Sequence, residues 1–352
     1  MSAQMMTLNG DSMMPRKVRF ALRIAAAAVL STCCLLPVSV GQTADSDADL
    51  AARDDWRAVV SQNADPREGC FQVTFPSIAW EQVECKALHP RVHPVVRKPG
   101  EEVSGNGNDY VAESSGLTSG ALGSFPTVSG VKSEKSVGVA EYGDGGILGP
   151  NEYSLQLNTN FTGTTTACDG HAGCVVWQQF IYATDYAVKG KGAVFMQYWL
   201  IGWGSSACPS GFGSDGGGDC YGNSKYVEAP DVKPTSLGSL SLSGAAAPGG
   251  SDTVVFTDGS TAYKVSGSDS VLDISQVWKE SEFNVVGDAG GSRANFNTPV
   301  SITVKVALTD GTTSAPTCVA NAGTTGESNN LNLGKCTTAS GSSPSIQFTE
   351  SN

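Results

Sequence analysis

Short apolar or alternating runs recur along most of this chain, and turn-forming residues separate them. The clearest runs are four to eight residues long: Tyr153–Asn158, Val175–Tyr182, Val194–Ile201, Leu237–Leu242, Thr253–Phe256, Ala262–Val265, Phe283–Val286, Ser301–Leu308 and Ser345–Phe348. Strand-forming residues in runs of this length and spacing are typical of an all-β sandwich. We therefore predict an antiparallel, concanavalin-like β-sandwich of the jelly-roll kind over residues 101–352.

Two turns and one helix interrupt the predicted strands. Thr257-Asp258-Gly259-Ser260 lies between two runs and predicts a type I′ hairpin, because Asp-Gly supplies positive φ angles. Thr309-Asp310-Gly311-Thr312 ends another run in the same way and predicts a second hairpin. The segment Val271–Lys279 has a helical pattern, with Trp278 on its apolar side.

Residues 1–41 have the features of a secretory signal peptide. A cluster of four basic residues precedes the apolar core Ile24–Leu36, and Ser39-Val40-Gly41 offers small residues for cleavage. The core is shorter than the ~20 residues that span a bilayer. A lipoprotein signal is the alternative, because Leu30-Ser31-Thr32-Cys33 resembles a lipobox. No later segment is apolar enough for a membrane helix.

Residues 42–100 form a distinct N-terminal segment. The spacing of apolar residues over Asp45–Val60 predicts a short exposed helix, and Cys70 and Cys85 enclose a small loop or hairpin. Three prolines within His89–Pro99 favour an extended linker. We predict a pro-segment or lid that packs on the main domain, and a simple N-terminal extension is the alternative.

The cysteines indicate an oxidising compartment. Eight of the ten lie outside the leader and form four sequential couples: Cys70/Cys85, Cys168/Cys174, Cys208/Cys220 and Cys318/Cys336. An even set, spread regularly along a β-rich chain with 42 glycines, is typical of a disulfide framework. We therefore predict a disulfide-stapled protein that is secreted to the extracellular space.

The net charge argues against two classes of partner. The full chain carries a formal charge of -12, and without the leader it has 18 basic and 33 acidic residues, which gives -15. Nucleic acid and anionic membranes both require clustered Lys and Arg. We expect neither as a partner of the mature protein, and we expect a monomer.

Several kinds of chemistry lack their usual motifs. Two of the three histidines lie in the proline-rich linker, and His171 lies between Cys168 and Cys174, so a serine triad is not predicted. The chain has no Gly-x-Ser-x-Gly elbow, no phosphate-binding Gly-x-x-x-x-Gly-Lys loop and no dinucleotide fingerprint that follows a strand. We predict no cofactor and no metal site. A calcium-binding turn at Gly213–Asp219 is the weaker alternative, because the motif occurs once.

Two candidate strands carry glutamines between aromatic residues. Because side chains alternate along a strand, Gln178 and Gln179 point to opposite faces, and one of them must face a core or a cleft. A buried amide is costly unless it is hydrogen-bonded. The residue is then either a satisfied structural amide or a group that orients water and stabilises an oxyanion.

Two glutamates are candidates for the partner acid. Glu282 lies at the entrance of an apolar strand, and Glu327 lies in the polar loop after Cys318. A glutamate held against tryptophans can act as a general acid or base. The alternative for both residues is a solvated or strand-capping carboxylate.

The run from Tyr153 to Trp203 resembles the secreted glutamic peptidases of the eqolisin and neprosin types. The strings that carry the resemblance are Tyr153-Ser154-Leu155-Gln156-Leu157-Asn158, Trp177-Gln178-Gln179-Phe180 and Gln197-Tyr198-Trp199-Leu200-Ile201. The resemblance implies a β-sandwich made with a leader and a propeptide, in which a Gln and a Glu activate water in acid. It gives the glutamine role to Gln178 or Gln179.

The chain departs from that family at the strand that should carry the catalytic glutamate. Gln197-Tyr198-Trp199-Leu200-Ile201-Gly202-Trp203 has no carboxylate, so activity requires Glu282, Glu327 or another acid. The resemblance covers about fifty residues, and it supports a fold more than a reaction.

Two other functions remain open. The first is a non-catalytic, lectin-like sandwich that binds glycans, with its aromatic residues as a stacking platform. The second is a glycosidase with two carboxylates ~5–9 Å apart. The favoured prediction is a secreted glutamic-type peptidase acting on extracellular polypeptide. Its candidate substrate-binding residues are Trp177, Gln197, Trp199 and Trp203.

Overall fold

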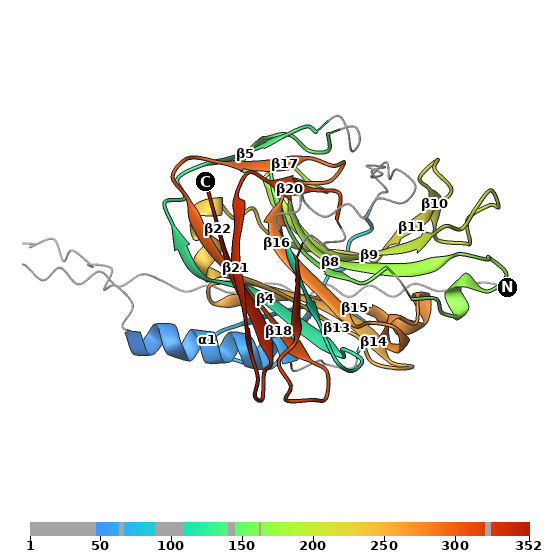
Figure 1. Ribbon diagram of the computed structural model, residues 1–352, viewed down its shortest axis with the longest axis horizontal. Helices are drawn as coiled ribbons and strands as arrows, with labels where there is room; N and C mark the ends of the chain where they lie inside the picture. The colour runs from blue at the N-terminus through green and yellow to red at the C-terminus, as the bar shows by residue number, and fades with distance from the viewer. Residues whose placement is uncertain (1–46, 63–66, 89–108, 140–144, 162, 321–324) are drawn as a thin grey trace, which may run out of the picture. The chain divides into compact units, whose positions relative to one another are not determined.

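The computed structural model describes residues 47–62, 67–88, 109–139, 145–161, 163–320 and 325–352 (Figure 1). The predicted signal peptide and the proline-rich linker His89–Pro99 lie outside these residues. None of the helices in the described part of the chain is long and apolar enough to cross a membrane.

The first large sheet contains nine strands. Its order is β2-β1-β15-β14-β13-β4-β18-β22-β21, and all neighbours are antiparallel. The bounds are β1 Gly69–Thr74, β2 Glu81–Val83, β4 Gly120–Ser129, β13 Leu240–Ala245, β14 Ser251–Asp258, β15 Thr261–Ser268, β18 Ser301–Thr309, β21 Asn332–Ala339 and β22 Ser345–Ser351.

The second large sheet is also antiparallel. Its order is β10-β11-β9-β8-β7-β16-β3-β19, and β12 pairs with β9 beside β11. The bounds are β3 Tyr110–Glu113, β7 Ser154–Thr159, β8 Val175–Thr184, β9 Lys191–Ile201, β10 Gly213–Ser214, β11 Cys220–Asn223, β12 Val227–Pro230, β16 Glu280–Val286 and β19 Thr317–Ala320.

A small third sheet and five helical segments complete the described structure. The third sheet joins β5 Glu134–Val137, β6 Gly149–Pro150, β17 Arg293–Phe296 and β20 Ser328–Asn329, and only its β17–β20 pair is parallel. The helices are α1 Asp47–Gln62 and the 3₁₀ turns Thr166–Cys168, Pro234–Ser239, Asp269–Val271 and Ile274–Gln276. The predicted all-β sandwich is confirmed.

The two large sheets pack face to face around one apolar core. Phe180 and Phe283 project from the second sheet and are fully buried. Each meets a glycine of the first sheet: a Cβ atom at Gly244 would lie 2.3 Å from the Phe180 ring, and one at Gly123 would lie 2.1 Å from the Phe283 ring. Large rings therefore fit against positions without side chains, and this lets the sheets approach closely.

Alternation along β8 gives the second sheet two distinct faces. Val176, Phe180 and Tyr182 belong to the core between the sheets. Trp177 and Ile181 point the other way and belong to separate apolar clusters on the outer face. These outer side chains are also buried, so both faces of the strand are withdrawn from water.

Four disulfides join the predicted cysteine couples. They are Cys70–Cys85, Cys168–Cys174, Cys208–Cys220 and Cys318–Cys336. The last one connects β19, at the edge of the second sheet, to β21, at the edge of the first. A covalent link thus joins the two sheets on that side of the sandwich.

The N-terminal segment is built into the first sheet. Strand β1 pairs with both β2 and β15, which extends the sheet beyond β15 and forms the hairpin expected between the first two cysteines. Helix α1 lies beside β13 and β14 (Figure 1). The helix was predicted to be exposed, but Trp56 and Val60 are buried against Val73, Val255 and Ala262. One face of α1 is therefore part of the fold.

Two local predictions were wrong. The segment 271–279 is not an α-helix, because Asp273 adopts a left-handed backbone (φ 52°) that a right-handed helix cannot contain. The turn at 309–312 does not make a hairpin, since β18 pairs with β4 and β22 while β19 joins β3 in the other sheet. A turn sequence specifies a change of direction but not the pairing partner.

The hairpin at Asp258 is present but is of another type. Residues Asp258 and Thr261 are paired, so the two-residue loop is Gly259-Ser260. Of these two residues, Gly259 alone has a positive φ angle, at 55°. Positive φ at only the first loop position is the pattern of a type II′ turn rather than the predicted type I′.

We predict that Gly123→Ala lowers the free energy of unfolding by about 1–3 kcal/mol, because the new methyl group overlaps the buried Phe283 ring. Urea denaturation measures the change. Gly238→Ala is the control, since its Cβ would meet nothing closer than 3.8 Å. Equal stability of the two variants would contradict the close approach of the sheets.

Candidate functional site

A row of polar side chains crosses the outer face of the second sheet. The strand registers align five residues in this polar row: Glu282, Asn158, Gln179, Gln197 and Asn223. Neighbours in the row are hydrogen-bonded where β16 meets β7, where β7 meets β8, and where β9 meets β11. The donor–acceptor distances of these bonds are 3.0, 3.2 and 2.9 Å.

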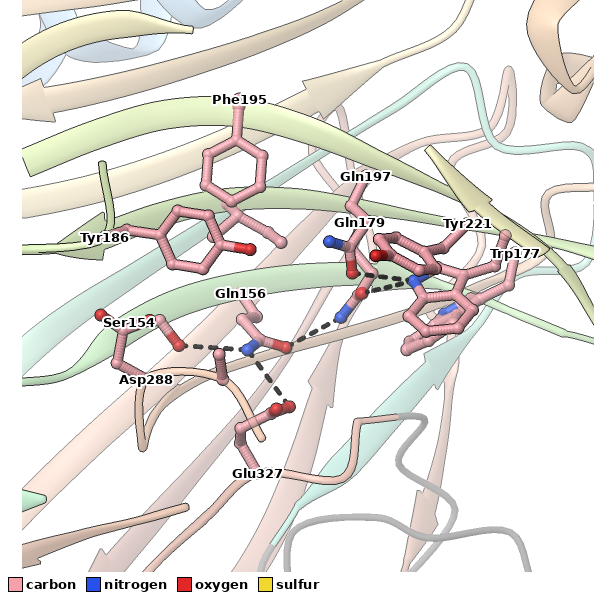
Figure 2. A pocket seen from close by; sticks show the side chains of 13 residues that line it. Ser154, Gln156, Trp177, Gln179, Tyr186, Phe195, Gln197, Tyr221, Asp288 and Glu327 are labelled. Atoms are coloured by element: carbon pink, nitrogen blue, oxygen red, sulfur yellow. Dashed lines mark hydrogen bonds between the residues drawn. The ribbon is translucent and has the colours of Figure 1, made fainter. Parts of the chain in front are cut away.

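Glu327 reaches this face from the loop that leads into β20. Its carboxylate accepts hydrogen bonds from the Thr325 hydroxyl, from the Gly291 backbone N–H at 3.3 Å, and from the Gln156 amide at 3.4 Å. Gln156 lies on β7, two residues before Asn158 and on the same face of the sheet, so it adjoins the polar row. Figure 2 shows Glu327 directed toward Gln156.

The hydrogen bonds of the site run in one direction. Trp199 shares its indole N–H between Gln197 Oε1 at 2.9 Å and Gln179 Oε1 at 3.1 Å, and Gln179 donates from Nε2 to Gln156 Oε1 at 3.0 Å. Gln156 then donates from Nε2 to Glu327. An indole N–H can only donate, so the Trp199 end fixes the orientation of the Gln179 amide and, through it, that of the Gln156 amide. The Gln156 N–H is thereby directed at the Glu327 carboxylate.

A small pocket lies beside this chain of bonds. Its volume of about 40 Å³ is enough for a water molecule. Figure 2 shows much of its lining, in which amides and carboxylates stand among aromatic rings. The lining residues are Ser154, Gln156, Trp177, Gln179, Ile181, Tyr186, Phe195, Gln197, Trp199, Tyr221, Asp288, Ala289 and Glu327.

Most of the site residues expected from the sequence come together here. Five of them line the pocket: Trp177, Gln179, Gln197, Trp199 and Glu327. Three others lie elsewhere. Gln178 faces the core between the sheets and donates to Met196 Sδ at 3.8 Å. Glu282 lies at the far end of the polar row, and Trp203 stacks on His171 with ring centroids 3.3 Å apart.

Sequence reasoning assigned no role to Gln156 or Asp288. Gln156 was visible in the alternating string Tyr153–Asn158, where it shares a face with Asn158, but nothing distinguished it from a surface residue. Asp288 follows β16 in a glycine-rich loop, and its backbone pairs with Ile147. Only the folding of that loop over the sheet brings Asp288 to the pocket.

A second group of carboxyl side chains lies at the Glu282 end of the polar row. Asp109 and Glu350 are fully buried and both accept hydrogen bonds from the Asn284 amide. Glu350 also accepts from Asn329 at 3.1 Å. Burial raises the pKa of Asp109 well above its usual range, and the charges of Glu282 and Glu350 add to this rise. Burial likewise raises the pKa of Glu350.

Burial also raises the pKa of two carboxyl groups elsewhere in the fold. Burial raises the pKa of Glu134 to about 9, with a smaller contribution from Glu152. Burial also raises the pKa of Asp252 to about 8, and the charge of Asp269 contributes further. In each case the folded state holds a proton that the unfolded chain, with pKa values near 4, releases more readily.

We predict that the protein is more stable in acid than at neutral or alkaline pH. A raised folded-state pKa gives stability that is complete below about pH 4 and is lost as the pH rises through the folded value. The urea midpoint should therefore fall between pH 4 and pH 9, in the range set by Asp252 and Glu134.

Glu350→Gln should make this pH dependence shallower, because the amide keeps an acceptor for Asn329 and cannot ionise. Glu113→Gln is the control, since Glu113 is exposed. A midpoint that rises steadily from pH 4 to pH 9 would contradict the assignment of buried, protonated carboxyl groups.

The site offers no obvious place for a metal ion. Within the residues that the structure describes, no three side chains of Asp, Glu, His or Cys are arranged to hold one. In the glycine-rich loop that resembled a calcium turn, Asp215 instead accepts hydrogen bonds from the backbone of Gly217 and Asp219 at 2.8 and 2.9 Å. These bonds stabilise the turn itself.

Comparison with known proteins gives weak likenesses in structure alone. No family model matches the chain, and no curated protein matches its sequence. Scytalido-glutamic peptidase with a transition-state analog inhibitor has 11% identity and a TM-score of 0.27, over 68% of this chain and 97% of that one. SCP-B, a member of the eqolisin family of peptidases, in a complex with a tripeptide, has 12% identity and a TM-score of 0.26, over 68% and 96%.

A κ-carrageenase gives a similar TM-score at lower identity. The κ-carrageenase from Pseudoalteromonas carrageenovora, in complex with an oligotetrasaccharide, has 6% identity and a TM-score of 0.25, over 68% of this chain and 66% of that one. The chain thus bears a weak resemblance to glutamic peptidases. Likenesses at this level decide nothing about activity.

Proposed function

We propose that this protein is a secreted hydrolase of the glutamic-peptidase type, with Glu327 as general base and Gln156 as the amide that polarises the substrate. The observation that carries the proposal is the 3.4 Å contact between Gln156 Nε2 and Glu327 Oε2 at the wall of a water-sized pocket. A contact at the long limit of a hydrogen bond can be exchanged for a bound water or a substrate oxygen.

The proposed reaction needs only these two side chains and water. Glu327 removes a proton from the water, and the water oxygen bonds to the carbonyl carbon of the scissile peptide. The carbonyl oxygen becomes negatively charged and accepts an N–H from Gln156. Glu327 then passes its proton to the amide nitrogen, the C–N bond breaks, and a carboxyl and an amine product leave.

The glycan-binding alternative receives less support. A stacking platform requires aromatic faces open to solvent, but Trp177, Trp199 and Tyr221 are only 2%, 6% and 4% exposed. Glycan hydrolysis has one observation in its favour, because two carboxyl groups, Asp288 and Glu327, line the same pocket. Glycosidases use both carboxyl groups of such a pair, whereas the proposed peptidase requires Glu327 alone.

Secretion and processing of the N-terminal segment belong to the same proposal. Four disulfides support an oxidising compartment. Residues 42–100 would act as a pro-segment: Lys86 pairs with the backbone of Tyr226, its ammonium binds Glu228, and Leu88 packs against the apolar cluster beside the pocket. These contacts bring the end of the segment, at Lys86 and Leu88, to the edge of the site.

We predict that Glu327→Gln lowers kcat for casein cleavage by about 10²–10⁴-fold, because general acid–base catalysis contributes that much. The purified protein would be incubated with unfolded casein from pH 3 to 8, and mass spectrometry would read both casein fragments and any loss of residues 42–100. Glu282→Gln is the matched control, since Glu282 lies outside the pocket lining.

The control variants also separate the remaining functions. Full casein cleavage by Glu327→Gln would refute the assigned base, and loss of activity only in Glu282→Gln would move the base to the other end of the polar row. If casein is not cleaved at any pH, oligosaccharides become the test substrates. Glycan cleavage that is lost in both Asp288→Asn and Glu327→Gln would indicate a glycosidase.

Trp199 should act as a positioning residue in this reaction. We predict that Trp199→Phe lowers kcat by about 10–100-fold with little change in KM, because the two amides lose the donor that fixes their orientation. Trp177→Phe, in the same aromatic cluster, is the control for the loss of an indole ring. Equal losses in both variants would indicate a packing role instead.

A further inference from the structure

A groove crosses the outer face of the first sheet beside helix α1, on the opposite side of the sandwich from the candidate active site. It consists of two adjoining hollows of about 330 and 500 Å³, and Leu122 lines both of them. Helix α1 contacts β13 and β14, and the floor of the groove extends over β13, β4 and β18. One side of the helix forms the wall of the groove, through Asp54, Arg57, Ala58, Ser61 and Gln62.

The strand register builds the floor of the groove from three rows of mostly small side chains. Each row takes one outward residue from β13, one from β4 and one from β18, because side chains alternate along every strand. The rows, in order along the groove, are Ser241-Ser124-Lys305, Ser243-Leu122-Ala307 and Ala245-Gly120-Thr309. Successive rows are ~7 Å apart, so the floor measures ~13 Å from the first row to the third.

One end of the groove is basic, although the chain as a whole is strongly acidic. Arg57 and Lys305 line the smaller hollow together with Asp54, whose carboxylate pairs with Arg57 Nη2 at 2.8 Å. Arg57 Nε is nevertheless buried and has no hydrogen-bond partner among the described residues. Lys305 is half-buried and forms no ion pair within the part of the chain that the structure describes. The hollow therefore offers a guanidinium N–H and an ammonium group to an anion such as a carboxylate.

The other end of the groove is mainly apolar. The larger hollow has Leu122, Ala245, Ala247, Pro248 and Ala307 in its lining, with hydroxyl groups of serine and threonine between them. A long floor with small apolar side chains leaves room for an alkyl chain. Such a chain gains free energy from every methylene group that leaves water.

We propose that this groove binds a linear anionic amphiphile of the fatty-acid type. The carboxylate lies between Arg57 Nε and the Lys305 ammonium group, and the alkyl chain extends along β4, over Leu122, toward Ala245 and Ala307. Charge complementarity at one end and apolar surface along ~13 Å of floor both match such a ligand. The groove and the candidate active site lie on opposite sides of the sandwich, so this binding does not require the proposed hydrolysis.

Calorimetric titration with three probes tests the class of ligand. Dodecanoate, butyrate and dodecyltrimethylammonium would each be titrated into the full chain, below the concentrations at which they form micelles. Dodecanoate should bind to one site. Butyrate should bind at least a hundredfold more weakly, because each buried methylene contributes about a fourfold gain in affinity. Dodecyltrimethylammonium should bind about tenfold more weakly than dodecanoate, because its charge is repelled at the basic end.

Three results of this titration would overturn the proposal. Butyrate that binds as tightly as dodecanoate would reveal a simple anion site without a tail groove. Equal binding of dodecanoate and dodecyltrimethylammonium would mean adsorption of alkyl chains without recognition of the charge. Absence of dodecanoate binding would exclude the amphiphile altogether.

One pair of variants tests the basic end of the groove. Lys305→Gln should weaken dodecanoate binding about tenfold, because the carboxylate loses a charged hydrogen-bond donor. Lys335→Gln is the matched control, since Lys335 belongs to the same sheet, is exposed and lies outside both linings. Equal affinities of the two variants for dodecanoate would contradict the position assigned to the carboxylate.

A second pair of variants tests the apolar end. Ala307→Phe should weaken dodecanoate binding at least tenfold, because the ring fills the middle row of the floor beside Leu122. Thr337→Phe adds the same ring to an exposed position of the same sheet outside the groove, and it should bind dodecanoate like the wild type. Unchanged binding by Ala307→Phe would place the alkyl chain elsewhere and refute the groove.

The same titration keeps this inference separate from the proposed function. Glu327→Gln should bind dodecanoate with the affinity of the wild type, because Glu327 lies on the outer face of the other sheet. A tenfold loss of affinity in this variant would place the ligand at the candidate active site and overturn the groove. Dodecanoate binding that depends on Lys305 and Ala307 upholds the groove whether or not casein is cleaved.

Discussion

The need to hydrogen-bond every buried polar group governs the candidate site. The outer face of the second sheet carries amides and carboxyl groups, yet loops and side chains withdraw it from water, so these groups must satisfy one another. The result is a network whose members have few alternative arrangements. Trp199 can only donate, and the amides of Gln179 and Gln156 align behind it. Each amide has one orientation because few donors and acceptors are within its reach. No single strong hydrogen bond is required.

Much of the fold could be predicted from short-range patterns. Runs with strong strand formers, such as those that became β8, β9 and β18, were found close to their actual bounds. Strand β4 was missed because Gly120, Gly123 and Pro126 are poor strand formers, although it pairs on both sides at the middle of the first sheet. Gly123 makes room for the Phe283 ring from the facing sheet, which no local pattern reveals.

The candidate site was predictable only where strands carry it. Alternation showed that Gln178 and Gln179 point in opposite directions, but it could not show which one faces the core. The structure decides this through neighbours distant in sequence: Gln179 bonds Trp199 and Gln156, while Gln178 contacts Met196. Glu327 was a candidate by chemistry alone, since its loop is separated from Gln156 by 171 residues. The sequence does not rank Glu327 above Glu282 as the candidate base, and only the tertiary packing distinguishes the two.

The disulfide between Cys318 and Cys336 encloses the segment that carries Thr325 and Glu327. Hydrogen bonds from Thr325, Gly291 and Gln156 hold Glu327 itself, and the disulfide ties down the two ends of its segment. A reducing cytosol does not allow that bond to form. For the proposed secreted hydrolase, the bond that fastens two sheet edges would therefore also couple completion of the catalytic centre to export.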